Sequence, residues 1–559
     1  MRRRRIVNHV LAATLVLALT SLYAGSIPVA HAATVVVNTT HDELNHDGDC
    51  SLREAVQAAN IDAAVDGCTA GSGADTISLP PGFYTLTIPG TDEDDNATGD
   101  LDIKGDLTVV GQSGAGNTII QAGTTSTNGI DRVLDVHWSV SYGVQINGVT
   151  IRFGRTPNLP AHDGGGIRNY GALTLNNSTV TGNAAPASLG RGGGIYNRSI
   201  GTLTLNDSTV SNNTAGRDGG GIYNAGVGAD LTLDSSVVSH NTAQGSGGGI
   251  YNHSGTVRLD DSTVADNDAD SDHDLSGNGG GISNHGTTTV ELNRSTVANN
   301  SATYGGGIYN QGDSTLILSR STIGDNDCAF SGGGIYNDNP VAMLILHMST
   351  VEGNDTGRGD GGGIYNGAGD LSLDKCTVSG NGSGDSGGGI YTAGSLSLDY
   401  TTIAKNRADF DGDGAGDGGG IRVGGGVADA RNTIIGDNSD RWPEAPDCSG
   451  RLTSLGYNLI EDTSGCTVAS ATGDLFGFAP KIGALGDNGG PTWTHALIGG
   501  SAAIEWIPAG ASGCQAGVSV DQRGYRRAGG AGYGGSRCDI GAYEYDTGPR
   551  QVYLPLVLR

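Results

Sequence analysis

Gly192-Gly-Gly-Ile-Tyr-Asn197 decides the fold, because this phrase recurs with small changes at intervals of 26 to 32 residues. Ten copies begin at Gly164, Gly192, Gly219, Gly247, Gly279, Gly305, Gly332, Gly361, Gly387 and Gly418. Each copy leads into a second phrase, such as Leu203-Thr-Leu-Asn-Asp-Ser-Thr-Val-Ser-Asn-Asn213. Self-similarity at a period of roughly 20 to 50 residues is typical of repeat architectures. Each copy therefore predicts one turn of a solenoid.

Alternation within the repeat assigns side chains to faces. Ile195 and Asn197 point one way and Tyr196 the other, because successive side chains of a strand alternate. The spacing Val/Ile-x-x-Asn also recurs, ending at Asn183, Asn213, Asn241, Asn267, Asn300, Asn326, Asn354, Asn381, Asn406 and Asn438. Three short strands per coil predict an all-β fold, a right-handed parallel β-helix of the pectate-lyase-like kind. Stacking then places asparagine on asparagine, where the amides hydrogen-bond between coils.

Composition limits the partners. The chain has 559 residues, 98 glycines at regular points rather than scattered, and a net charge of −28 with a pI near 4.5. This charge argues against nucleic acid and anionic membranes and favours divalent cations. The alternative is that the acidity serves solubility alone.

Residues 1–32 have the features of a signal peptide. An arginine run precedes an apolar stretch, and Ala30-His31-Ala32 forms a cleavage site. No later stretch is long and apolar enough to span a membrane. We expect a protein that is secreted, extracellular or at the cell surface of a bacterium.

Eight cysteines fit an oxidising compartment. Six form local couples near the two ends, namely Cys50 with Cys68, Cys448 with Cys466, and Cys514 with Cys538. Each closed loop contributes roughly 3 kcal/mol. The pairing of Cys328 and Cys376 stays open, because they occupy different phases of the repeat.

The stretch Cys50-Ser-Leu-Arg-Glu-Ala-Val-Gln-Ala-Ala-Asn60 predicts a short amphipathic helix, in which Ser51 and Glu54 spell a capping box. It resembles the CSLREA domain of bacterial exported proteins. The resemblance implies an exported, repeat-bearing surface protein and covers residues 33–73 as an N-terminal cap. Residues 74–163 read as irregular first coils of the β-helix.

Residues 164–440 are the regular repeats. Their Gly-Gly-Gly-Ile and Val-x-x-Asn pairing resembles the repeats of the chlamydial polymorphic outer-membrane proteins, with Gly for Ala and Val or Ile for Phe. That resemblance implies a surface-exposed, adhesin-like β-helix.

Residues 441–546 depart from the repeat. Three of their motifs resemble the choice-of-anchor Q domain of bacterial β-helix surface proteins, namely Ser454-Leu-Gly-Tyr-Asn-Leu-Ile460, Ala484-Leu-Gly-Asp-Asn-Gly-Gly-Pro-Thr-Trp-Thr-His-Ala-Leu497 and Cys538-Asp-Ile-Gly-Ala-Tyr-Glu544. The resemblance implies attachment to the cell surface. We expect His495, Asp521, Arg523, Asp539 and Glu544 to form a polar network that closes the C-terminal end. Residues 547–559 form a tail.

Tyrosines that follow the recurring Ile predict an aromatic file on the outer face of one sheet, interrupted at Ser283. Its members are Tyr196, Tyr223, Tyr251, Tyr309, Tyr336, Tyr365 and Tyr391. An exposed file of this kind can stack on the sugar rings of a glycan. The alternative is that like residues stack on each other only to stabilise the ladder.

Two acidic insertions interrupt the repeat before Gly279 and Gly418. The second contains Asp409, Asp411 and Asp413 in a DxDxDG spacing that turns successive carboxylates onto one Ca²⁺. The alternative is a solvated turn.

Catalytic residues are sparse at the outward positions. Arg168 and Asp163 are exceptions that would begin an active cleft. No acid triplet aligns coil over coil in the sequence. The prediction is therefore a non-enzymatic protein for adhesion, surface structure or glycan binding, whose partner is an extracellular glycan or cell-surface component. The alternative is a polysaccharide lyase or glycoside hydrolase.

Overall fold

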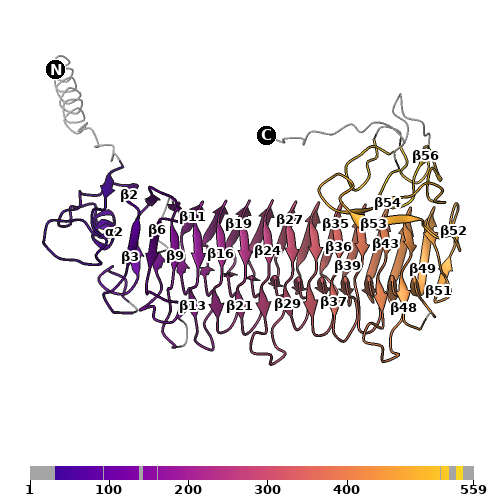
Figure 1. Cartoon of the computed structure of the whole chain (residues 1–559), viewed down its shortest axis with the longest axis horizontal. Coiled ribbons are helices and arrows are strands. Elements are labelled where there is room, and N and C mark those ends of the chain that lie inside the picture. The colour runs from indigo at the N-terminus through magenta and orange to yellow at the C-terminus, as the bar shows by residue number, and fades with distance from the viewer. Residues whose placement is uncertain are drawn as a thin grey trace, which may run out of the picture.

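The computed structural model describes residues 32–91, 93–137, 143–159, 162–442, 444–515, 518–527 and 537–545. The described chain is a parallel β-solenoid of about 13 turns (Figure 1). This confirms the predicted parallel β-helix. The predicted signal peptide, apart from residue 32, and the tail at 547–559 lie outside the described residues.

Four ladders of stacked parallel strands run along the solenoid, and we name them A to D. Ladder A contains β1 (Thr34–Val36), β2 (Asp75–Leu79), β5 (Leu107–Gly111), β8 (Val144–Asn147), β11 (Ala172–Asn176), β15 (Thr202–Asn206), β19 (Asp230–Asp234), β23 (Thr256–Asp260), β27 (Thr289–Asn293), β31 (Thr315–Ser319), β35 (Met343–His347), β39 (Asp370–Asp374), β42 (Ser395–Asp399), β46 (Val427–Arg431), β49 (Cys448–Gly456) and β51 (Cys466–Ala469). Ladder B contains β3 (Gly82–Thr85), β6 (Thr118–Gln121), β9 (Thr150–Arg152), β12 (Thr179–Thr181), β16 (Thr209–Ser211), β20 (Val237–Ser239), β24 (Thr263–Ala265), β28 (Thr296–Ala298), β32 (Thr322–Gly324), β36 (Thr350–Glu352), β40 (Thr377–Ser379), β43 (Thr402–Ala404), β47 (Ile434–Gly436), β50 (Leu459–Ile460) and β52 (Leu475–Phe476).

Ladder C carries the recurring Ile-Tyr-Asn. It contains β4 (Leu101–Ile103), β7 (Leu134–Val136), β10 (Ile167–Asn169), β14 (Ile195–Arg198), β18 (Ile222–Ala225), β22 (Ile250–His253), β26 (Ile282–His285), β30 (Ile308–Gln311), β34 (Ile335–Asn337), β38 (Ile364–Asn366), β41 (Ile390–Thr392) and β45 (Ile421–Val423), and it ends on the first residues of β49.

Ladder D is a fourth set of strands, two residues long, where the sequence predicts only three strands per coil. It contains β13 (Ala184–Ala185), β17 (Thr214–Ala215), β21 (Thr242–Ala243), β25 (Asp268–Ala269), β29 (Ser301–Ala302), β33 (Asp327–Cys328), β37 (Asp355–Thr356), β44 (Arg407–Ala408) and β48 (Ser439–Asp440). These pairs follow the turn asparagine and are too short to show an alternating pattern.

Three consecutive glycines are required at the turn into each ladder C strand. The first glycine has a positive φ in all ten copies, such as 63° at Gly192, which L-residues rarely adopt. A Cβ on Gly193 would lie 2.4 Å from the backbone of Thr214, and one on Gly194 would lie 2.6 Å from the carbonyl oxygen of Gly221 in the next coil. The triplet therefore makes the turn and lets neighbouring coils approach closely.

Two ladders of buried asparagines run between the coils. In the turn ladder, the Asn183 amide donates to Oδ1 of Asn213 at 3.0 Å, and the series continues to Asn438, whose amide donates to Asp447 at 3.0 Å. This confirms the predicted stacking. The second ladder follows the tyrosines in ladder C, where Asn169 donates to Asn197 at 2.7 Å. Because both ladders are buried, their hydrogen bonds replace those that water would make.

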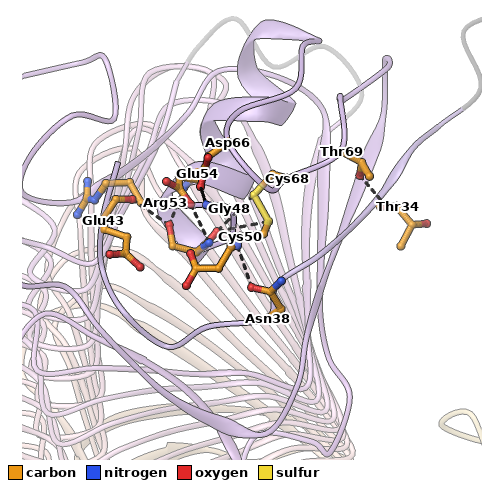
Figure 2. Close-up of a disulfide and its surroundings, with 12 residues drawn as sticks. Thr34, Asn38, Glu43, Gly48, Cys50, Arg53, Glu54, Asp66, Cys68 and Thr69 are labelled. Carbon is orange, nitrogen blue, oxygen red and sulfur yellow. Dashed lines mark hydrogen bonds between the residues drawn. A yellow bond between two sulfur atoms is a disulfide. The ribbon is translucent and has the colours of Figure 1, made fainter. Parts of the chain in front are cut away.

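The N-terminal end is covered by helix α2 (Leu52–Ile61), the one helix among the described residues. Ser51 caps it, and the reciprocal bonds with Glu54 form the predicted capping box. The Cys50–Cys68 disulfide holds the segment beside the helix, where the Cys50 N–H donates to Asn38 at 2.8 Å (Figure 2). Arg53 is fully buried and its Nε donates to Asp42 at 2.7 Å.

The strand ladders continue beyond the end of the sequence repeat near residue 440, through β49, β50, β51 and β52. After β52 the chain turns back and lies along ladder B (Figure 1). This segment carries two small antiparallel pairs, β53 (Ile482–Gly486) with β54 (Thr494–Leu497) and β55 (Ile507–Pro508) with β56 (Arg537–Cys538).

Threonines on the outer face of ladder B receive the returning segment. The Thr377 hydroxyl donates to Gln522 at 2.7 Å, the Thr350 hydroxyl donates to the Trp493 carbonyl at 2.7 Å, and Ser379 contacts His495 at 2.8 Å. Four of the five expected residues form one polar network. Arg523 pairs with Asp521, whose carboxylate accepts from the Glu544 N–H, and the Glu544 carboxylate accepts from the Asp539 N–H. His495 instead contacts Ser379 and the Gly483 carbonyl. The place of this network corrects the prediction, because it covers the flank of the last coils rather than their open end.

All three predicted disulfides are present, with Cys448–Cys466 joining β49 to β51 and Cys514–Cys538 closing the returning segment. Cys328 and Cys376 are buried and free. Within the described residues, no helix combines the length and the apolar character needed to cross a membrane.

Candidate functional site

One column of outward side chains runs the length of ladder C and is the candidate functional surface. Strand register places one residue per coil in the column. From the N-terminal end the column contains Asp102, Asp135, Arg168, Tyr196, Tyr223, Tyr251, Ser283, Tyr309, Tyr336, Tyr365, Tyr391, Arg422 and Ser449. Charged residues therefore flank a central run of aromatic rings.

The aromatic rings stack on one another. Neighbouring tyrosine centroids are 4.8 to 5.2 Å apart, and the stacked tyrosine pairs are tilted by at most 12°. Ser283 interrupts the tyrosine file as expected. The imidazole of His285 fills the gap, 5.1 Å from the Tyr251 ring and 5.4 Å from the Tyr309 ring. Ser283 holds this imidazole at 2.9 Å. The column is thus continuous over eight rings.

The rings are less exposed than the sequence predicts for a file of tyrosines that stacks on sugar rings. Tyr196, Tyr223 and Tyr309 are buried, and Tyr251 and the remaining tyrosines of the column are half-buried. Since each ring between Tyr196 and Tyr391 has a neighbouring ring on both faces, a sugar ring has no free face to stack on inside the column. Ring edges and hydroxyls are what the column offers to a partner.

Burial keeps these groups in their neutral forms. It raises the pKa of Tyr309 and of Tyr365 to about 12, so their hydroxyls remain hydrogen-bond donors at neutral pH. It also lowers the pKa of His285 to about 4, so this imidazole is uncharged in the stack. The column is therefore an uncharged aromatic surface between charged ends.

The N-terminal end of the column brings two carboxylates together on adjacent coils. Asp102 Oδ1 lies 3.1 Å from His137 Nε2, and Asp135 Oδ2 accepts from Arg168 Nε at 2.7 Å. Burial raises the pKa of Asp102, and the hydrogen bond with Asp102 raises the pKa of His137. Asp135 Oδ1 is buried and has no hydrogen-bond partner.

This N-terminal cluster also has the donors of a metal site. One ligand atom from each of Asp94, Asp102, Asp135 and His137 lies within 4.8 Å of the others. Carboxylates combined with an imidazole suit a transition metal. Arg168 competes for the same position, because its guanidinium already neutralises Asp135.

The cluster corrects one expectation from the sequence and adds a pair of acids to it. Arg168 pairs with Asp135 rather than beginning a cleft with Asp163, whose carboxylate accepts from the backbone N–H of Arg191 at 2.9 Å. Asp102 and Asp135 align coil over coil as a pair that the sequence reasoning did not identify, and Arg168 rather than a third acid follows them in the column. The signal was Leu101-Asp-Ile103 and Leu134-Asp-Val136, which match the Ile-Tyr-Asn phase but lack the preceding glycine triplet.

The two acidic insertions form loops beside ladder D. The structure brings the carboxylates of Asp409, Asp411 and Asp413 within 4.8 Å of one another, as a shared cation would require. Asp409 is fully buried, whereas the other two are exposed. The loop at Asp270 groups its acids in the same way.

Comparisons with known proteins bear on the repeat and on the architecture. The family described as Chlamydia polymorphic membrane protein (Chlamydia_PMP) repeat matches residues 207–225 and 235–253, each spanning a turn asparagine and the next glycine triplet. Among solved structures, the chain is similar to the crystal structure of pectate lyase Pel9A, with 13% identity and a TM-score of 0.30 over 93% of this chain and 98% of that chain. Comparison with curated proteins gives no match.

Proposed function

We propose that this protein works at the surface of a bacterium, or outside it, as a non-enzymatic solenoid that binds an extracellular glycan or cell-surface component along ladder C. The observation that carries the proposal is the continuous column of eight aromatic rings. A rigid column repeats the same ring edge and hydroxyl at each coil that carries a tyrosine. A linear polymer with its own repeat is the kind of partner that can use many such weak contacts together.

The surface location rests on the sequence. The apolar leader and the cleavage site at its end support export, and the two matched repeats belong to a family described as membrane proteins. The resemblance of residues 33–73 to CSLREA domains and of residues 441–546 to choice-of-anchor Q domains supports the same location.

The column binds through hydrogen bonds and ring edges in this proposal, because the ring faces are occupied. Tyr365 and Tyr391 are half-buried neighbours whose rings lie 5.1 Å apart. Replacing both by Phe removes two hydroxyls and keeps the stack. Each net hydrogen bond contributes about 0.5 to 1.5 kcal/mol, so the double variant should bind about tenfold more weakly.

The test is affinity electrophoresis of residues 33–559 in gels that contain acidic or neutral polysaccharides. We expect at least one polysaccharide to retard the wild type, and Y365F/Y391F to lose most of this retardation. The control Y457F, which alters a half-buried tyrosine outside the column, should be retarded as much as the wild type. Equal retardation of all three proteins would rule out the column as the binding surface. If the wild type is not retarded by any polysaccharide, a glycan is not the partner.

The second candidate function is a polysaccharide lyase or glycoside hydrolase. Asp102 and Asp135 favour it, because paired carboxylates next to His137 and Arg168 are the groups that acid–base cleavage of a glycosidic bond uses. Both carboxylates are almost fully buried, and each already has a basic partner. This arrangement fits a structural ion cluster better than an open active site.

A further inference from the structure

Two loops of the solenoid start from equivalent positions, and each begins with a buried aspartate. The loops differ in the hydrogen bonds that they donate to this aspartate. Asp270 follows β25 and Asp409 follows β44, both strands of ladder D. Each aspartate has a positive φ, 75° at Asp270 and 50° at Asp409, and each is buried. Each loop also carries two exposed aspartates at the second and fourth positions after the buried one.

The protein itself satisfies Asp270. Its Oδ1 accepts from the backbone N–H of Leu275 at 2.9 Å, and its Oδ2 accepts from the Thr303 hydroxyl at 3.0 Å. A buried carboxylate with donors on both oxygens needs no further counter-charge to remain in place.

Asp409 lacks the second donor. Its Oδ1 accepts from the backbone N–H of Gly414 at 3.2 Å, but its Oδ2 is buried and has no hydrogen-bond partner. An unpaired buried carboxylate oxygen costs several kcal/mol unless a cation or a proton compensates it. The carboxylate that carries this oxygen is one of the three in the group of Asp409, Asp411 and Asp413.

Acids from the flanking coils add to the negative charge. Asp440 is 7% exposed and lies in register with Ala408. Neither of its carboxylate oxygens accepts a hydrogen bond of good geometry, although the backbone N–H groups of Trp442 and Ala445 lie close enough to lower its pKa. Burial, followed by the charges of Asp417 and Asp409, raises its pKa. Among the described residues, ion pairs form at Asp417 and at Asp399, and none involves Asp409 or Asp440. The guanidinium of Arg441 lies against Gly412 in the same loop without pairing with either carboxylate.

We propose that Asp409, Asp411 and Asp413 bind one Ca²⁺, which compensates the buried oxygen of Asp409. Calcium takes six to eight oxygen ligands at about 2.3 to 2.6 Å, so ligand atoms within 4.8 Å of one another can share one ion. Asp411 and Asp413 are exposed, and they leave the ion open to solvent and to water ligands. The site lies on the turn that follows β44, beside the coil that carries Asp440. It does not depend on the proposed function.

The test uses the metal alone on calcium-free residues 33–559. Isothermal titration with CaCl₂ should show one Ca²⁺ per chain, with a Kd on the order of 10⁻⁴ M, as in extracellular modules. D411N/D413N should bind at least tenfold more weakly. The matched control D272N/D274N removes the same charge from the Asp270 loop and should bind like the wild type.

A second measurement reports the location of the ion. The indole of Trp442 borders the loop, since its nitrogen lies 3.5 Å from where a Cβ on Gly414 would be. Tb³⁺ in place of Ca²⁺ should therefore give indole-sensitised emission that W442F removes while calorimetric Ca²⁺ binding persists. Absence of binding in the wild type, equal loss in both double variants, or loss only in D272N/D274N would overturn the proposal.

Discussion

Replacing Asn241 by Ala tests whether the turn ladder stabilises the solenoid. The Asn241 side chain is fully buried and makes four hydrogen bonds. Its Oδ1 accepts from the backbone N–H and the amide of Asn213, each at 3.0 Å, and its amide donates to the Val210 carbonyl and to Asn267, each at 3.0 Å.

The magnitude follows from the groups that lose a partner. The Asn213 N–H becomes a buried donor without an acceptor, and the Val210 carbonyl loses the amide that it accepts from. Each such group costs about 1 to 3 kcal/mol, so N241A should lower the free energy of unfolding by about 3 to 5 kcal/mol.

The matched control is N206A. Asn206 is half-buried in ladder A, its amide donates to Asn176 at 2.8 Å, and Asp234 takes its place in the next coil. We expect a loss of less than about 1 kcal/mol, because water can replace this bond. Urea denaturation followed by circular dichroism compares the two variants. If N241A unfolds at the same urea concentration as N206A, the buried ladder does not stabilise the fold as argued.

Three further predictions concern single positions. The pKa of His285 is lowered from 6.5 to about 4, so its contribution to stability is present above pH 6.5 and is lost as the pH falls toward 4. Thermal unfolding across this range should show the wild type losing about 3 kcal/mol that H285F retains. Removing the disulfide in C50S/C68S opens an 18-residue separation and should cost about 3 kcal/mol in chemical denaturation, with unchanged stability arguing against its role in the cap. Burial raises the pKa of Cys328 and of Cys376 to about 12, so iodoacetamide should label neither in the native protein and both after denaturation, as mass spectrometry would show.

The repeat part of the fold was predictable because each local signal has one physical explanation. Gly192 needs a positive φ, Gly194 needs the absence of a Cβ, and Asn213 needs a neighbour of its own kind. These requirements recur at every coil, so the sequence shows them many times. The capping box at Ser51 was predictable for the same reason, since its partner Glu54 is three residues away.

Contacts between distant segments were not predictable. Thr377 and Thr209 occupy the same position of the repeat in ladder B, yet only Thr377 is covered by the returning segment and bonded to Gln522. Nothing in the local sequence distinguishes the two threonines, because the difference lies in a segment 145 residues away.

The candidate site was predictable only in part for a related reason. The tyrosine column follows from the repeat, but the place of the His285 ring depends on the gap that Ser283 leaves. The pair Asp102 and Asp135 lies outside the regular repeats, where no glycine triplet marks the register of the strands.

The absence of glycan cleavage is the central claim, and analysis of chain ends tests it most directly. Residues 33–559 would be incubated with acidic and neutral polysaccharides, with and without Ca²⁺, alongside D102N/D135N. The account predicts that polysaccharide is retained and that neither protein produces new reducing or unsaturated ends. New ends that appear with the wild type and disappear with D102N/D135N would contradict it and identify the N-terminal carboxylate pair as an active site.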